Sequence, residues 1–174
     1  LLEDPENCDR YLKYEIGKFD KDAMVSYNID GEKLVRVSED GEGTFLNIYE
    51  FISPSTADIC NGEVMDKFIE LTHEEYKRRY GKKFNKDLSG FFTDEPQYYR
   101  WQHPYTKVLK GYFKEKYGED LLDGLGLMFV EKEGYRAFRY KYWICMQELM
   151  LKNFSKKIYD WCDDNGVKLT GHYI

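Results

Sequence analysis

The amino-acid sequence predicts an α/β fold, namely part of a (β/α)8 barrel of the TIM type that follows an N-terminal antiparallel β-hairpin or meander. From residue 46 onward the predicted order is strand, helix, strand, helices and strand, whereas the earlier residues have strand patterns without a helical period. We therefore expect an antiparallel β insertion over residues 1–45 and a partial barrel over residues 46–174. A complete barrel needs roughly 250 residues. Three barrel strands, ending near Phe51, Glu95 and His172, indicate a parent domain that continues beyond both ends.

The N-terminal region has the pattern of paired strands. Residues 24–29 and 33–37 flank Asp30-Gly31, a dipeptide that favours a two-residue hairpin turn because glycine adopts positive φ. Residues 11–19 are a further strand candidate. Over residues 44–51 two sets of side chains alternate, namely Phe45, Asn47, Tyr49 and Phe51 with Leu46, Ile48 and Glu50. These segments predict three or four antiparallel strands, the last of which leads into the barrel.

Helical periodicity begins after residue 53. In the first helix, one face carries the apolar side chains of Val64, Phe68, Leu71, Tyr76 and Tyr80. Gly81 follows at the position where glycine commonly ends a helix. Further helices are predicted over residues 108–117, 121–129 and 135–164, and a final strand over 167–172.

Composition excludes some classes of partner. The 174 residues carry a net charge of -6, and basic residues are dispersed among acids, so neither nucleic acid nor an anionic membrane is expected as a partner. The run Lys77-Arg78-Arg79, for example, follows three glutamates on one predicted helix, as on a solvated face with paired charges. Aromatic residues make up 17% of the chain, which suits carbohydrate-binding clefts as well as cores.

The cysteines give no sign of a metal site. Their wide spacing lacks a CxxC or Cys/His pattern and predicts free thiols at Cys8, Cys60, Cys145 and Cys162. No signal peptide or spanning helix is recognisable, but the chain begins Leu1-Leu2 without a methionine. The compartment is left open, with only a lean toward the bacterial cytoplasm.

Two adjacent carboxylates end the strand predicted over residues 88–95. Phe91, Phe92 and Thr93 favour a buried strand, and Pro96 cannot extend its ladder, so Asp94 and Glu95 should lie at the strand's C-terminal end. Barrel enzymes carry catalytic residues at that end. The alternative is a solvated turn, since Asp and Pro are common where strands end.

A family resemblance sharpens the assignment. Residues 92–96, preceded by the helix segment 68–76, and residues 160–172 resemble glycoside hydrolases of the α-L-rhamnosidase-like group, with similarity over roughly residues 49–174. The resemblance implies a general acid after the fourth barrel strand, which would be Glu95, and a second carboxylate after a seventh strand that this chain lacks. It also implies cleavage of glycosidic bonds in poly- or oligosaccharides, with α-L-rhamnosides among the candidates.

Asp94 and Glu95 should not themselves be the catalytic pair. Neighbours on a strand point to opposite faces, so a Glu95 that reaches the barrel mouth leaves Asp94 to hold a loop, a sugar hydroxyl or a cation. As a general acid Glu95 needs a raised pKa, which Trp101 or Tyr98 could provide through desolvation.

Other substrate-binding candidates lie near these acids. His172 follows Gly171 at a strand end and could hydrogen-bond a sugar hydroxyl or only a neighbouring carbonyl group. Trp101, Tyr98 and His103 could line the cleft, although the rings could equally fold onto the rim and the loop histidine could be solvated. His73, mid-helix among glutamates, is predicted to lie at the surface.

Two other functional classes stay open at this point. Without its second carboxylate the segment could be a non-catalytic carbohydrate-binding or structural barrel piece. It could also be a metal-dependent hydrolase with Asp94, Glu95 and His172 as ligands, although HxH and HExxH spacing is absent. We assign no cofactor and no metal ligand, while a structural Ca²⁺ is compatible with the carboxylates. Exposed sheet edges could drive self-association.

Overall fold

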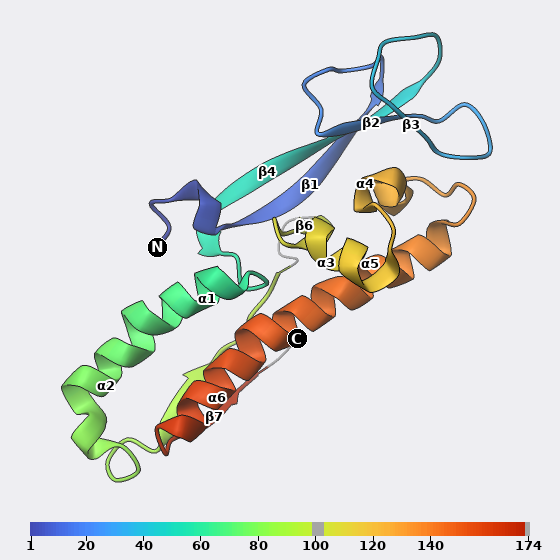
Figure 1. The fold of residues 1–174 in the computed structure, drawn as a ribbon. Helices are drawn as coiled ribbons and strands as arrows, with labels where there is room; N and C mark the ends of the chain where they lie inside the picture. The colour runs from blue at the N-terminus through green and yellow to red at the C-terminus, as the bar shows by residue number, and fades with distance from the viewer. Residues whose placement is uncertain (99–102, 173–174) are drawn as a thin grey trace. The chain divides into compact units, whose positions relative to one another are not determined.

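The computed structural model describes residues 1–98 and 103–172 and has a mixed α/β fold (Figure 1). Its strands form one five-stranded sheet and one separate two-stranded sheet, and no closed barrel is found among these residues. The three predicted barrel strands are therefore not all parallel neighbours here. No helix in the described part of the chain combines the length and apolarity needed to cross a membrane.

The chain divides into two compact units that alternate along the sequence. We call the first the strand-pair unit; it comprises Leu1–Asp9, Pro54–Arg100 and Glu148–Ile174. The second, the sheet unit, comprises Arg10–Ser53 and Trp101–Gln147. The predicted boundary between residues 45 and 46 stays a prediction about the parent domain.

The five-stranded sheet has the order β3-β2-β4-β1-β6. Its strands are β1 (Cys8–Gly17), β2 (Val25–Asn28), β3 (Val35–Val37), β4 (Phe45–Ala57) and β6 (His103–Tyr105). The pairs β2–β3, β2–β4 and β1–β6 are antiparallel, which confirms the antiparallel character predicted for the N-terminal region.

Two details of this sheet differ from expectation. The β2–β3 register pairs Asn28 with Val35, so the hairpin loop is longer than the predicted two residues. Asp30 instead accepts hydrogen bonds from the backbone N–H of Thr44 with both carboxylate oxygens, at 3.0 and 3.3 Å. The prediction that the strand reaching Phe51 is a parallel barrel strand is wrong in this structure, because β4 pairs with β1 and β2 in the antiparallel sheet.

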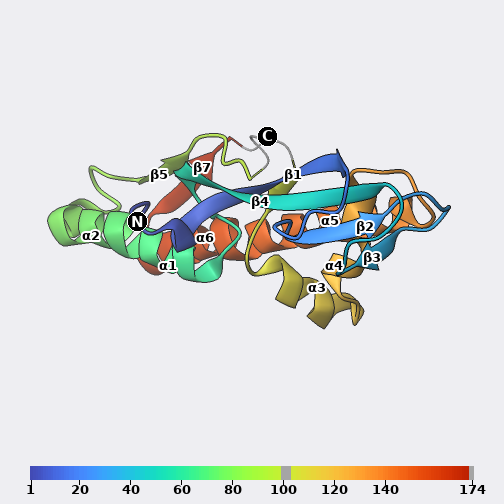
Figure 2. The ribbon, with the colours of Figure 1, turned by 90° about the horizontal axis from the view of Figure 1, so that it is seen from above.

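The helices of the sheet unit, drawn from above in Figure 2, contribute buried side chains to its core together with the strands. They are α3 (Leu109–Tyr117), α4 (Leu121–Gly124) with a 3-10 turn (Leu125–Met128), and the first part of α5 (Tyr135–Met150), which confirms three predicted helices. The buried Tyr27 of β2 donates its hydroxyl to the Leu122 carbonyl at 2.5 Å. A Cβ on Gly126 would lie 2.9 Å from the Tyr27 ring, so the helical turn after α4 packs directly on the sheet.

The strand-pair unit sets two parallel strands beside helices. In chain order its elements are a 3-10 turn (Pro5–Asn7), α1 (Gly62–Ile69), a π turn (Glu70–Glu74), α2 (Glu75–Tyr80), a 3-10 turn (Gly81–Lys83), β5 (Gly90–Thr93), a second π turn (Leu151–Lys156), α6 (Lys157–Asp164) and β7 (Lys168–Gly171). β5 and β7 pair in parallel, which confirms both as strands. β5 is not buried as predicted, because its residues alternate between exposed and half-buried and Phe92 is 57% exposed.

The first π turn changes which helix face is buried. Val64 and Met65 lie in the core as an amphipathic helix requires, but Leu71 is 47% and Tyr76 49% exposed. A π turn inserts one residue and so rotates the following side chains by about 100° relative to a regular helix. His73 therefore turns inward and is buried, so its predicted surface position is wrong.

Two asparagines fix the ends of these helices. Asn61 caps α1 by accepting the backbone N–H of Glu63 at 3.1 Å. The buried Asn153 in the second π turn donates to the Cys60 carbonyl at 2.6 Å, which ties the two helical segments together. α2 ends at Tyr80 and Gly81 is its C-cap, as predicted, although with right-handed angles that lead into the 3-10 turn. All four cysteines are buried free thiols, as predicted.

Candidate functional site

The candidate site lies at the C-terminal ends of β5 and β7. Their parallel register pairs Thr93 with Gly171, and the backbone N–H of His172 donates to the Thr93 carbonyl at 3.0 Å. A Cβ on Gly171 would lie 2.1 Å from that carbonyl oxygen, so this close approach needs glycine. The next residues of the two strands, Asp94 and His172, therefore leave the same edge side by side.

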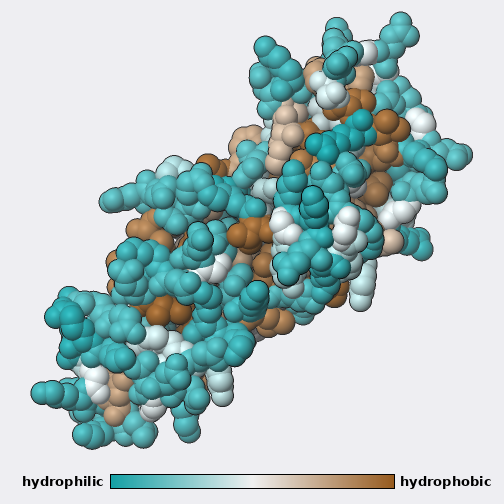
Figure 3. Space-filling model, in the orientation of Figure 1, coloured by the Kyte–Doolittle hydropathy of each residue, from teal (hydrophilic) through white to brown (hydrophobic). Residues whose placement is uncertain are grey.

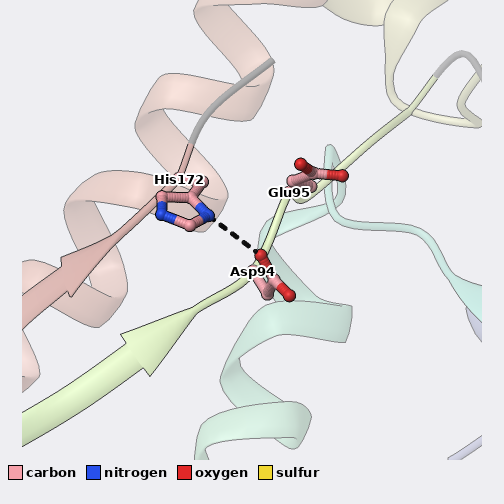
Figure 4. Close-up of side chains that lie close together, drawn as sticks. All are labelled: Asp94, Glu95 and His172. Atoms are coloured by element: carbon pink, nitrogen blue, oxygen red, sulfur yellow. Dashed lines mark hydrogen bonds and ion pairs between the residues drawn. The ribbon is translucent and has the colours of Figure 1, made fainter.

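Asp94, Glu95 and His172 form a cluster at this edge (Figure 4). Ligand atoms of all three lie within 4.8 Å of one another, and all three residues are exposed. His172 Nδ1 lies 3.2 Å from Asp94 Oδ1. Since an ionised carboxylate only accepts hydrogen bonds, Nδ1 carries the proton, and in the neutral ring Nε2 is left as an acceptor.

The backbone at Glu95 is in a conformation that side chains disfavour. Its φ is +46°, in the left-handed region, and proline follows. A residue before proline prefers extended angles, and left-handed geometry costs a non-glycine residue roughly 1–2 kcal/mol. β5 ends at Thr93, so this turn, rather than strand alternation, sends the Asp94 and Glu95 side chains in different directions in Figure 4.

The cluster offers two kinds of chemistry. An exposed carboxyl group beside a carboxylate–imidazole pair can exchange a proton with a bound molecule and accept its hydroxyl hydrogens. The same oxygen and nitrogen atoms could instead surround a cation. Glu95 is exposed in the described structure, and Trp101, one of the two rings expected to enclose it, lies outside the described residues.

The loop residues predicted to line the cleft are placed only in part. Trp101 lies outside the described residues, and Tyr98 is half-buried. His103 lies on β6 in the sheet unit, where it is half-buried and its ring centroid is 4.5 Å from that of Phe129. Burial lowers the pKa of His103, so this histidine is not the solvated loop residue considered as its alternative.

An aromatic layer behind β5 was missed by the sequence reasoning. The ring of buried His73 contacts Phe91 at 4.9 Å and Trp161 at 5.0 Å between centroids. Thr72 donates its hydroxyl to a helix carbonyl, so it accepts the proton of His73 Nδ1 over 2.8 Å. Burial lowers the pKa of His73, and the neutral ring supports the strand from behind. No periodic pattern signals this position, because the π turn breaks the helical period.

Comparisons with known proteins bear on the fold. No protein-family model matches the chain, and no curated protein sequence matches it. A solved rhamnosidase from Novosphingobium sp. PP1Y has a similar structure, with a TM-score of 0.57 and 16% identity. The alignment covers 80% of this chain and 15% of that enzyme, so the chain spans a small part of the enzyme's length. At this identity the likeness is one of fold alone.

Proposed function

We propose that this chain is a segment of the catalytic region of a glycoside hydrolase, a partial (β/α)8 barrel in which Glu95 is the general acid. The observation that carries the proposal is the position of Glu95 beside the Asp94–His172 pair, at the C-terminal edge of two parallel strands. Barrel enzymes place catalytic residues at this edge. The fold similarity to a rhamnosidase supports the same reading and makes α-L-rhamnosides natural first substrates to test.

Each residue of the cluster has a separate role in this proposal. Glu95 protonates the oxygen of the leaving group, while a second carboxylate outside this chain acts as nucleophile or base. Asp94 holds His172 through Nδ1, so that Nε2 can accept a hydrogen bond from a sugar hydroxyl. Tyr98, Trp101 and His103 stay proposed contacts to more distant sugar units.

The decisive experiment compares leaving groups in the full-length protein. A panel of aryl glycosides, α-L-rhamnoside included, identifies the substrate, and Glu95→Gln is then assayed with a phenyl and a dinitrophenyl leaving group. Loss of a general acid lowers the rate by about 10²–10⁴-fold where the leaving group needs protonation. The dinitrophenyl glycoside, whose anion departs unaided, should lose far less.

The matched control is Glu115→Gln, because Glu115 is an exposed glutamate on α3 whose loss also removes one charge. It should leave both rates unchanged. Equal losses with both leaving groups in Glu95→Gln would contradict an acid role, and unchanged hydrolysis would remove Glu95 from the mechanism. Sugar binding without hydrolysis in the unaltered protein would favour the non-catalytic alternative.

A metal-dependent hydrolase is a second candidate, favoured by the 4.8 Å spread of the three possible ligand atoms. Two carboxylates and an imidazole suit zinc better than calcium, which prefers oxygen ligands alone. The test is activity after chelation and after return of Zn²⁺ or Ca²⁺. Activity that disappears and returns, and that is lost in His172→Ala, supports this candidate, whereas activity unaffected by chelation removes it.

A further inference from the structure

A polar pocket lies at the opposite edge of the strand pair from the Asp94–Glu95–His172 cluster. It has a volume of about 740 Å³ and is lined by Lys77, Arg78, Arg79, Gly81, Lys82, Phe84, Asp164 and Asn165. Phe84 precedes β5 and Asn165 precedes β7, so these lining residues place the pocket near the beginnings of both strands. Four residues of extended chain separate the two strand edges by about 13 Å, so the pocket is distinct from the cluster.

Cations dominate the pocket wall although the whole chain is acidic. Four basic side chains face one carboxylate, that of Asp164, in a protein of net charge -6. Hydrophilic side chains cover most of the lower-left end of Figure 3, where α2 ends. Such a concentration of one sign raises the local concentration of anions.

Two of these cations have no partner among the residues that the structure describes. Arg78 and Arg79 both bind Glu75, at 2.6 and 2.5 Å, and these contacts lower the pKa of Glu75 to about 2. The Lys77 and Lys82 ammonium groups, by contrast, make no hydrogen bond or ion pair with any residue that the structure describes. The arginines thus form the solvated, paired face predicted from the sequence, and the two lysines stay available to a bound anion.

The C-terminal dipole of α2 favours these cations. Cations are favoured in the last turn of a helix, which explains the run of three that ends with Arg79. Lys82 lies in the 3-10 turn that directly follows α2, where the same effect favours a cation. Helix stability thus accounts for positive charge at this end, and the two lysines still have no acidic partner among the described residues.

The remaining wall suits a hydroxylated ring. Phe84 is half-buried, with its ring edge-on to Trp161 and Phe91 at 6.2 and 6.1 Å between centroids, so it is a fixed apolar surface. Asn165 donates its amide N–H to the Trp161 carbonyl at 2.7 Å, which leaves its Oδ1 free to accept. Asp164 adds further acceptors for hydroxyl groups.

We propose that this pocket binds an acidic sugar, with the carboxylate or sulfate of the sugar on Lys77 and Lys82, hydroxyls on Asp164 and Asn165, and the ring against Phe84. An inorganic anion would use the lysines alone, whereas only a ligand with hydroxyl groups also uses the acceptors of Asp164 and Asn165. The choice of a sugar as the ligand rests on the proposed glycoside hydrolase function. The pocket would hold a charged unit of the polymer away from the bond that is cleaved.

The test measures binding of tri-galacturonic acid to the full-length protein carrying Glu95→Gln, so that no turnover interferes. The methyl ester of the same trisaccharide is the control ligand without charge. Inorganic phosphate is the control ligand that carries charge but no sugar ring. The double variant Lys77→Gln/Lys82→Gln is compared with Lys114→Gln/Lys152→Gln, which removes the same charge from exposed lysines that do not line the pocket. We expect the dissociation constant for the trisaccharide to rise at least about tenfold in the first variant and not in the second.

Several outcomes overturn the proposal. They are an absence of trisaccharide binding, equal weakening in the two double variants, equal binding of the methyl ester, and phosphate that competes as well as the trisaccharide does. Binding is read out separately from hydrolysis. Glycosidase activity that survives Glu95→Gln would contradict the proposed function and would leave the result for this pocket in place.

Discussion

The left-handed backbone of Glu95 gives a stability prediction that can be measured without any substrate. At φ +46° a side chain of any kind is penalised, whereas glycine is not. The perturbation is a pair of variants, Glu95→Ala and Glu95→Gly, which both remove the carboxylate. Their difference isolates the backbone preference, because everything beyond Cβ is absent from both.

The expected magnitude follows from two opposing effects. Left-handed geometry costs alanine roughly 1–2 kcal/mol, and glycine loses about 0.4–1 kcal/mol more through the greater freedom of its unfolded chain. Glu95→Gly should therefore be more stable than Glu95→Ala by about 0.5–1 kcal/mol. Pro96 strengthens the expectation because it further restricts the residue before it.

Urea denaturation at equilibrium, with equal m-values in both variants, gives this difference directly. The same two substitutions at Glu115 are the control, since a residue within α3 should prefer alanine over glycine by about 1 kcal/mol. The order of stability should thus be reversed between the two sites. If alanine is preferred at both, Glu95 does not hold a left-handed conformation in solution and the reasoning fails.

Three further predictions concern the residues around β5. Gly171→Ala should destabilise the protein by roughly 1–3 kcal/mol, because the added Cβ would clash with the Thr93 carbonyl oxygen. The control is Gly111→Ala on α3, which should be tolerated because the space around its Cβ is open. Thermal unfolding of the two variants measures the difference. Thr93→Val should raise the free energy of unfolding by up to about 1 kcal/mol, since the buried Thr93 hydroxyl has no hydrogen-bond partner among the described residues, and a loss of stability would contradict this. Burial lowers the pKa of His73 below its ordinary value of 6.5, so the unfolded chain binds a proton at higher pH than the folded chain does. The contribution of His73 to the free energy of unfolding is therefore complete above about pH 6.5 and decreases as the pH falls below that value. His73→Phe should remove part of that slope between pH 7 and 5 in urea titrations, and an unchanged slope would count against a buried neutral imidazole.

The sequence was most informative about β5 and β7. Both are short β-favouring segments bounded by turn residues, and their parallel pairing follows from the intervening helices. The partner of β4 could not be read in the same way. Alternation along residues 44–51 describes two faces of a strand, while the neighbouring strands are decided by tertiary packing.

The helix before β5 shows a different limit of sequence reasoning. Periodicity analysis assumes 3.6 residues per turn, and the π turn at Glu70–Glu74 violates that assumption in the middle of the segment. Positions before the turn, such as Val64, were assigned to the correct face, and positions after it were not. The glutamates beside His73 predict a surface position, whereas the π turn directs its ring inward onto Phe91 and Trp161.

The sequence predicts where the candidate site lies but not the backbone conformation of its residues. Strand ends bring Asp94 and His172 together, but a residue before proline is expected to be extended, so nothing in the sequence announces the left-handed Glu95. That conformation also bears on the proposed role. Glycine at this position would give a more stable protein than glutamate does. A glutamate there is explained if its carboxyl group has a role in function that outweighs this cost in stability. We expect Glu95→Gly to be more stable than Glu95→Ala and to have no glycosidase activity. That result would show that the residue with the strained backbone is also the residue that glycoside cleavage requires.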